Sequence, residues 1–390
     1  MPNLDLFHEE LDRYVRAKSE LDARVTRDLE RCRSCFTGSS TAWLFSSVAA
    51  RHADLSAQVP GVKVAQGADA RAAKKLQKKL DKTLADNFFA QMWSDAAYTK
   101  LLTGSVCWAV TASGGAVRLS QPDLRSVFWE PGCLSLDDSE AVYVRSTVLP
   151  GRFYALFPKA RGRRPELTPD GRRVVVTDRY SVGPRGLELL RFSGDAVIFD
   201  SAESGGAFRS LGTYPLVIDR LYPDDRSPAG YGYFDLYGGV QRDIDRLNAA
   251  ITDNVCAGSR RRYFCRVGGG VNEREFADES RPIVHVANSF LGEDSIREIT
   301  PAPLPAISLG LLESRIAELK SVSFNRDAVS GGTETGVTSG TAINALQQAA
   351  MKASNDISGT SERAMHRLFN LTLSLLGGRF GDAKVVRNEE

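Results

Sequence analysis

The sequence lacks the features of a secreted, membrane-spanning or disulfide-bonded protein. No apolar run approaches the roughly 18 residues that a transmembrane helix needs. The N-terminal segment MPNLDLFHEELDR is acidic and amphipathic, which is unlike a signal peptide. Six cysteines occur in 390 residues, at spacings that do not suggest a disulfide framework. We therefore expect a protein of a reducing cytoplasm that makes no contact with a membrane.

The sequence also offers no constellation for catalysis or cofactor binding. The glycines of Gly268–Gly270 lack the lysine of a phosphate loop, and no GxxxxGK[ST] motif occurs. Cys32 and Cys35 have the spacing of half a zinc site, but the other half is missing, so two unpaired helix cysteines are the simpler interpretation. The four histidines are scattered and show no pairing with a nucleophile. We expect no enzymatic activity, no metal and no cofactor.

The formal net charge is only +2, and hydrophobic residues make up 42% of the chain, as in ordinary globular proteins. A free-standing DNA-binding domain usually has a larger basic excess. Two local basic clusters stand out, a lysine stripe over Lys74–Lys82 and a proline-flanked loop over Arg161–Arg164. The lysine stripe could touch DNA or another protein, but a solvated helix face is the simpler interpretation. For Arg161–Arg164, an exposed loop is the simpler interpretation.

The first two thirds of the chain predict helices followed by a β-rich region. Apolar residues at helical spacing predict helices over 3–36 and 41–58, and a helical pattern from a cap at Asp69 to Gly104. From 106 to about 217, short runs such as VCWAV, AVYVRSTVL and DAVIFD are bounded by Gly, Pro or Asp. Their alternation predicts antiparallel sheet. The fold class is therefore α+β.

The last third predicts two striped helices around a compact excursion. The first helix covers about 231–257, the excursion follows from Arg260 to Pro305, and the second helix continues from Leu309. A glycine-rich loop then leads to a final long helix that ends near 376, with Gly359 as a candidate kink. Neither striped helix can bury both of its sides within one chain. We expect an antiparallel pair that packs against copies of itself in a closed ring.

This order of elements resembles the portal (head-to-tail connector) proteins of tailed bacteriophages. The segments LLTGSVCWAV and LSQPDLRSVFWEPGC resemble strands of the portal wing, and YPLVIDRLYPDDRSPAGYGYFDLYGGVQRDIDRLNAAITDN resembles the wing-to-stem junction. GGTETGVTSGTAINALQQ resembles a tunnel loop entering its helix. Each motif is weak alone, and their order is the specific part. The resemblance covers nearly the whole chain.

The resemblance implies a portal fold with a wing of helices and antiparallel sheet, a two-helix stem, a small α/β clip and a long kinked helix. The implied parts are the N-terminal wing (1–229), stem helix 1 (230–258), the clip (259–304), stem helix 2 (305–330), the tunnel loop (331–338), the kinked wing helix (339–377) and a short C-terminal tail (378–390). Portals usually carry a helical crown after the long helix, so we expect a crown that is minimal or absent.

The resemblance further implies the function and the partners. Portal proteins form a ring, usually a dodecamer, at one capsid vertex of the virion, after assembly in the bacterial host cytoplasm. Double-stranded DNA passes through the ring during packaging and ejection. The implied protein partners are the major capsid protein, the scaffold, the large terminase and then a head-tail adaptor.

The implied functional residues lie in the last third. The DNA-facing tunnel loop would consist of Gly331, Gly332, Thr333, Glu334, Thr335, Gly336, Val337 and Thr338. Possible channel charges are Lys320 and Arg326, because a ring turns one charge into a band. The clip would dock its partners through Arg260, Arg261, Arg262 and Arg266, although salt bridges between subunits are an equal alternative for these arginines.

Two other functions compete with the portal. One is a helical scaffold or adaptor of the virion that oligomerises through the striped helices but conducts no DNA. The other is a DNA-processing enzyme, which would need a metal or nucleotide site that the sequence does not offer.

Overall fold

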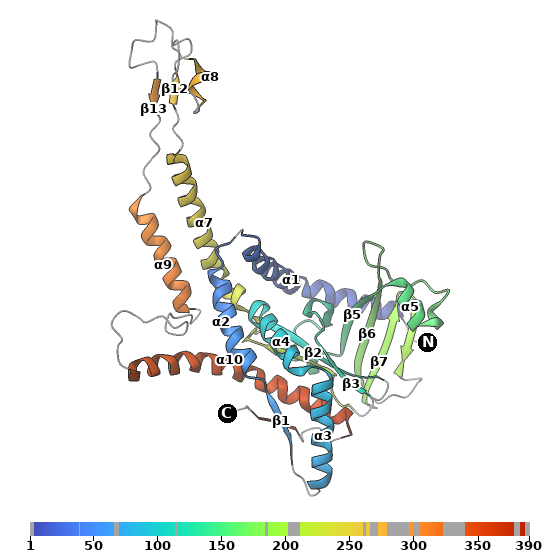
Figure 1. The fold of residues 1–390 in the computed structure, drawn as a ribbon. Helices are drawn as coiled ribbons and strands as arrows, with labels where there is room; N and C mark the ends of the chain where they lie inside the picture. Colours follow the sequence, from blue (N-terminus) through green and yellow to red (C-terminus); the bar gives the residue numbers. More distant parts are fainter. Residues whose placement is uncertain are drawn as a thin grey trace. The chain divides into compact units, whose positions relative to one another are not determined.

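A computed structural model describes residues 4–38, 40–65, 70–113, 116–183, 186–201, 211–259, 263–265, 272–278, 296–298, 305–322, 340–377 and 383–386. The structure is mixed α+β, and every strand pair within these residues is antiparallel. It divides into two compact units (Figure 1). Unit 1 comprises Met1–Gly239 and Lys320–Glu390, and unit 2 comprises Val240–Leu319.

Four helices and one strand open unit 1. They are α1 (Leu4–Phe36), α2 (Trp43–Ala57), β1 (Gly61–Val64), α3 (Ala70–Asp86) and α4 (Phe89–Thr103). The helices predicted over 3–36 and 41–58 are confirmed as α1 and α2. In α1, Leu11, Tyr14, Val25 and Cys32 are buried at helical spacing, so one stripe of this helix faces the core.

The helical pattern predicted from Asp69 to Gly104 is interrupted, so a single helix there is wrong. Phe88 adopts a left-handed conformation with φ of 52°, and it separates α3 from α4. The side chain of Asn87 donates to Val117 O at 3.0 Å, and Leu119 N donates to Asn87 Oδ1 at 2.9 Å. The break therefore serves a tertiary contact with a neighbouring strand, β3.

The predicted β-rich region is confirmed as two main sheets. The strands and short helices in order are β2 (Ser105–Ser113), β3 (Ala116–Ser120), η1 (Leu124–Ser126), β4 (Val127–Trp129), η2 (Leu136–Asp138), β5 (Ala141–Val148), α5 (Pro150–Leu156), η3 (Pro158–Ala160), β6 (Val174–Gly183), β7 (Gly186–Ser193), β8 (Ala196–Asp200) and β9 (Leu216–Arg220). One sheet has the order β3-β2-β9, and the other is the meander β4-β5-β6-β7-β8.

The remaining elements complete both units. They are β10 (Tyr222–Pro223), β11 (Gly230–Tyr231), α7 (Tyr233–Ser259), β12 (Tyr263–Cys265), α8 (Glu273–Phe276), β13 (Ile296–Glu298), α9 (Ala306–Val322), α10 (Gly340–Leu375) and β14 (Ala383–Val386). In unit 2, β12 pairs with β13 between the two helices of the sequence. In unit 1, β14 pairs with β1, so the segment expected to be a short tail contributes a strand to the body.

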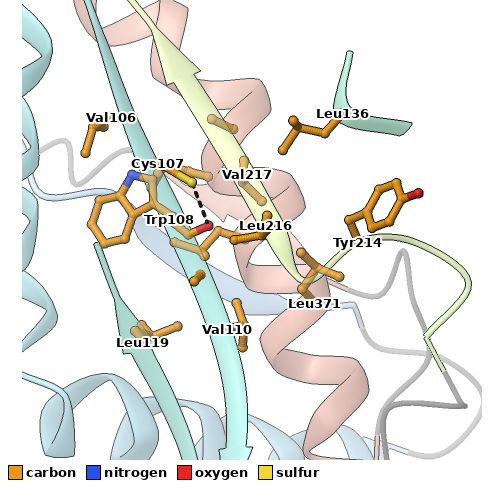
Figure 2. Packing of buried hydrophobic residues seen from close by; sticks show 14 of the residues in the cluster. Val106, Cys107, Trp108, Val110, Leu119, Leu136, Tyr214, Leu216, Val217 and Leu371 are labelled. Carbon is orange, nitrogen blue, oxygen red and sulfur yellow. Dashed lines mark hydrogen bonds between the residues drawn. The ribbon is translucent and has the colours of Figure 1, made fainter. Parts of the chain in front are cut away.

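The core of unit 1 lies around β2. All residues from Ser105 to Val110 are buried, which means that both faces of this strand are covered. Both α4 and α10 contact β2, and Phe89 of α4 packs on Trp108 and Phe369. Figure 2 shows Trp108 and Val217 of this cluster with Leu371 from α10. The last helix of the chain is thus part of the same core as the first strands.

No helix within the described residues is both long enough and apolar enough to cross a membrane.

Candidate functional site

Most of the residues predicted from the resemblance lie outside the described part of the chain. This applies to the tunnel loop Gly331–Thr338, to Arg326, and to the clip arginines Arg260–Arg262 and Arg266. Their roles stay predictions. Of the candidate channel charges, Lys320 is described. Its Nζ lies 5.4 Å from the ring centroid of Trp43 in α2, a cation–π contact inside unit 1.

Both cysteines of the CxxC pair make hydrogen-bond contacts in the described structure. Cys32 is buried, and its Sγ lies 3.4 Å from the hydroxyl of Tyr98, while the Cys35 thiol donates to Arg31 O at 3.5 Å. Within the described ranges, no three His, Cys, Asp or Glu residues converge as metal ligands. The lysine stripe occupies α3, and the five lysines in it are exposed.

Unit 2 exposes apolar side chains on its helices. Ile307, Leu309 and Leu311 of α9 are exposed, with Ile307 at 79%, and so is Val255 of α7. Leu319 of α9 is buried, so α9 carries both buried and exposed apolar side chains. The apolar surface of α9 therefore extends beyond the single stripe that the sequence predicted from Leu309 onwards. Exposed apolar residues that recur along one helix are typical of a surface that another protein covers.

Arg315 of α9 forms an ion pair within its own helix. Its Nη1 lies 2.7 Å from Glu318 Oε2, three residues further along the chain. This hydrogen bond to Glu318 is the main cause of the raised pKa of the Arg315 guanidinium.

A buried polar cluster anchors α10 to the body of unit 1. Lys100 of α4 and Asp219 of β9 are 2% and 1% exposed, and their Nζ and Oδ1 atoms are 2.8 Å apart. Lys100 also donates to Thr360 Oγ1 at 2.8 Å and to Ser361 Oγ at 2.5 Å. The Ser361 hydroxyl donates to Asp219 Oδ2 at 2.8 Å. Side chains from α4, β9 and α10 therefore meet around one ion pair. The residues that α10 contributes directly follow Gly359.

This cluster was not predicted, although each half left a signal. Lys100 stands in the apolar stretch AAYTKLLTG, and Asp219 stands in the strand LVIDRL. A single charge within an otherwise buried segment normally has a partner. The sequence alone did not indicate that the two charges meet.

A second polar cluster holds α1 against the start of α7, within unit 1. Arg24 of α1 approaches Asp235 at 3.7 Å and Asp224 at 3.6 Å, and its guanidinium stacks 4.3 Å from the ring centroid of Tyr231. The side chain of Asp28 is fully buried, and Arg31 Nη1 donates to its Oδ1 at 3.3 Å. Five charged side chains thus meet where α7 begins.

The carboxyl group of Asp28 has a raised pKa in this cluster. Burial raises the pKa of Asp28 to about 7, and a hydrogen bond to Asp235 adds to this effect. Arg31 also donates to Phe234 O at 3.3 Å and packs on Gly238, beside the boundary between the two units.

These clusters position helices, and they have the chemistry of structural anchors. In the Lys100 cluster, the ammonium, the carboxylate and the Ser361 hydroxyl are all hydrogen-bonded to one another. Neither the comparison with protein-family models nor the comparison with curated proteins finds a match for this chain.

Proposed function

We propose that this chain is the subunit of a phage portal, a ring at one capsid vertex that conducts double-stranded DNA during packaging and ejection. The observation that carries the proposal is the organisation of the chain. A β-containing unit is interrupted by a unit with a helix, a small two-stranded sheet and a second helix. The chain then returns through the 36-residue helix α10 into the first core. The portal resemblance implies this order of parts.

The exposed apolar residues of unit 2 support the oligomeric part of the proposal. Ile307 and Leu311 are four residues apart on α9, so they lie on the same face of the helix. In a ring, the neighbouring subunits would cover such faces, and closure would leave no unpaired interface. The ring would also serve as the docking platform for the large terminase and then for a head-tail adaptor, and it would contact capsid and scaffold proteins.

Negative-stain electron microscopy with mass photometry tests the proposal on the purified full-length chain. We expect rings of uniform subunit number, with an axial hole at least about 20 Å wide to admit B-form DNA. A monomer or an open filament at every concentration tested would refute the portal. A closed oligomer without such a hole would instead favour a helical scaffold or adaptor that conducts no DNA.

A loop variant tests the assignment of the channel. Shortening 331–338 should leave ring assembly unchanged and reduce DNA packaging or retention, because the tunnel loop would face the DNA. Normal packaging by the shortened variant would contradict this assignment. Charge reversal at Arg260, Arg261 and Arg262 should weaken docking of terminase or adaptor, and unchanged docking would assign these arginines to contacts between subunits.

A further inference from the structure

A pocket on unit 1 gathers three arginines, two of which lack partners within the described residues. The cavity has a volume of about 400 Å³, and it lies between β9, α10 and the segment around Leu134. Its lining includes Arg220 of β9 together with Arg363 and Arg367 of α10. One of the three is neutralised, because the Arg367 guanidinium donates to both carboxylate oxygens of Asp137. The pocket therefore keeps two unneutralised positive charges.

Arg220 and Arg363 have no hydrogen-bond acceptor or ion-pair partner in the described part of the chain. Arg220 is half-buried, so water satisfies its five donors less completely than at an open surface. A guanidinium matches carboxylate and phosphate oxygens through two parallel hydrogen bonds. Two such groups in one cavity predict an anionic ligand.

The rim of the pocket narrows the choice of ligand. Leu134, which is 53% exposed, lines the same cavity. An inorganic anion would gain nothing from this leucine, whereas an acidic side chain carried by a protein segment with a neighbouring apolar residue would contact both. The chemistry of the pocket therefore favours an acidic and apolar protein surface.

The chain itself carries a matching surface. Asp5, Glu9 and Asp12 of α1 are exposed and have no partner among the described residues. Their spacing of four and three residues places them in one row, roughly 10 Å long. Leu6, which is 58% exposed, lies beside this row. None of these residues lines the pocket of its own chain.

We propose that the Arg220–Arg363 pocket of one subunit binds the acidic row Asp5–Glu9–Asp12 of a second copy. The contact joins two different surfaces, so it is heterologous, and repetition of a heterologous contact generates a ring where the rotation closes. The inference rests on the proposed function in this respect, since a portal is such a ring. It adds a specific contact between neighbouring subunits, outside the helices of unit 2.

Charge-swap variants test the contact by mass photometry of the full chain across a concentration series. We expect R220E/R363E to weaken assembly by at least about tenfold, because like charges would then face each other. The variant E9R/D12R should weaken assembly similarly. Combining the four substitutions should restore assembly, which a merely misfolded variant could not do. The matched control K75E/K79E makes the same charge change on α3 and should assemble like the wild type.

The outcomes separate the inference from the proposed function. A wild-type chain that stays monomeric at all concentrations overturns both. A wild-type ring that is unaffected by R220E/R363E, or four substitutions that weaken assembly additively, overturns the contact and leaves the portal standing. Calorimetric titration with inorganic phosphate tests the other possible ligand of the pocket, a free anion. Phosphate binding that R220E/R363E abolishes without a change in assembly would identify a free-anion site and overturn the contact.

Discussion

Replacing Lys100 by methionine should loosen α10 more than any surface substitution. The change removes the positive partner of Asp219, whose carboxylate is 1% exposed and would remain buried beside Ser361. Breaking a buried ion pair from one side costs about 3–5 kcal/mol, because the remaining charge loses its compensation. Since Lys100 also donates to Thr360, the loss falls directly on the attachment of α10.

Native-state hydrogen exchange measures this loss where it occurs. Amides between Ile357 and Leu375 should lose protection in Lys100→Met by an amount that approaches the full 3–5 kcal/mol in opening free energy. The double variant Lys100→Met/Asp219→Leu should recover a large part of this loss, with a coupling energy of at least about 2 kcal/mol. A local probe is needed because a chain with two units does not have to unfold in one step.

An exposed ion pair provides the control. Arg125 and Asp123 are 36% and 48% exposed and lie 2.6 Å apart, so Arg125→Met should cost less than about 1 kcal/mol. Equal effects of Lys100→Met and Arg125→Met would show that the buried ion pair does not anchor α10. Simple additivity of the two substitutions in the double variant would show the same.

Three further substitutions test other parts of unit 1. Gly104→Ala should lower the melting temperature strongly, because the φ of Gly104 is +81° and an added Cβ would overlap the backbone at Tyr231. A melting curve like that of the wild type would contradict this. Phe88→Asn should raise the free energy of unfolding by about 0.5–1 kcal/mol, as denaturant titration would show. Asparagine tolerates the left-handed conformation, and the Phe88 side chain is 76% exposed, so little packing is lost. The pKa of Asp28 is raised from 3.8 to about 7, so its contribution to stability is complete below pH 4 and is lost as the pH rises through 7. Asp28→Asn should remove this pH dependence from the unfolding midpoint, and an unchanged pH profile would contradict the raised pKa of Asp28.

The regular helices and the β-rich region were predictable because their patterns are local. The apolar stripe of α1 and the β-branched runs between 106 and 217 each follow from residues close in sequence. The interruption at Phe88 was not predictable in this way, because Leu84, Phe88 and Met92 continue the helical spacing through it. What breaks the helix is the bonding of Asn87 to β3, some 30 residues further along the chain.

Long-range pairings were beyond local reasoning for the same physical cause. The strand Gly61–Val64 has only four residues, and its partner Ala383–Val386 lies at the other end of the chain. Likewise, the charges of Lys100 and Asp219 were visible in their apolar segments, but their meeting depends on three elements folding together. The arginine pocket combines segments near 134, 220 and 363, so no single stretch of sequence could indicate it.

The discontinuity of unit 1 has a consequence for biosynthesis. On the ribosome, residues 1–239 emerge first, yet their core lacks Phe369 and Leu371 until about 130 further residues have been made. Lys100 and Asp219 likewise wait for Ser361 to complete their hydrogen bonding. Unit 2 is continuous in sequence and can fold while the ribosome still holds α10. Each nascent chain must therefore be synthesised beyond α10 before its largest body closes. A chain terminated before α10 would leave the apolar faces of β2 and β9 uncovered for capture by chaperones and proteases.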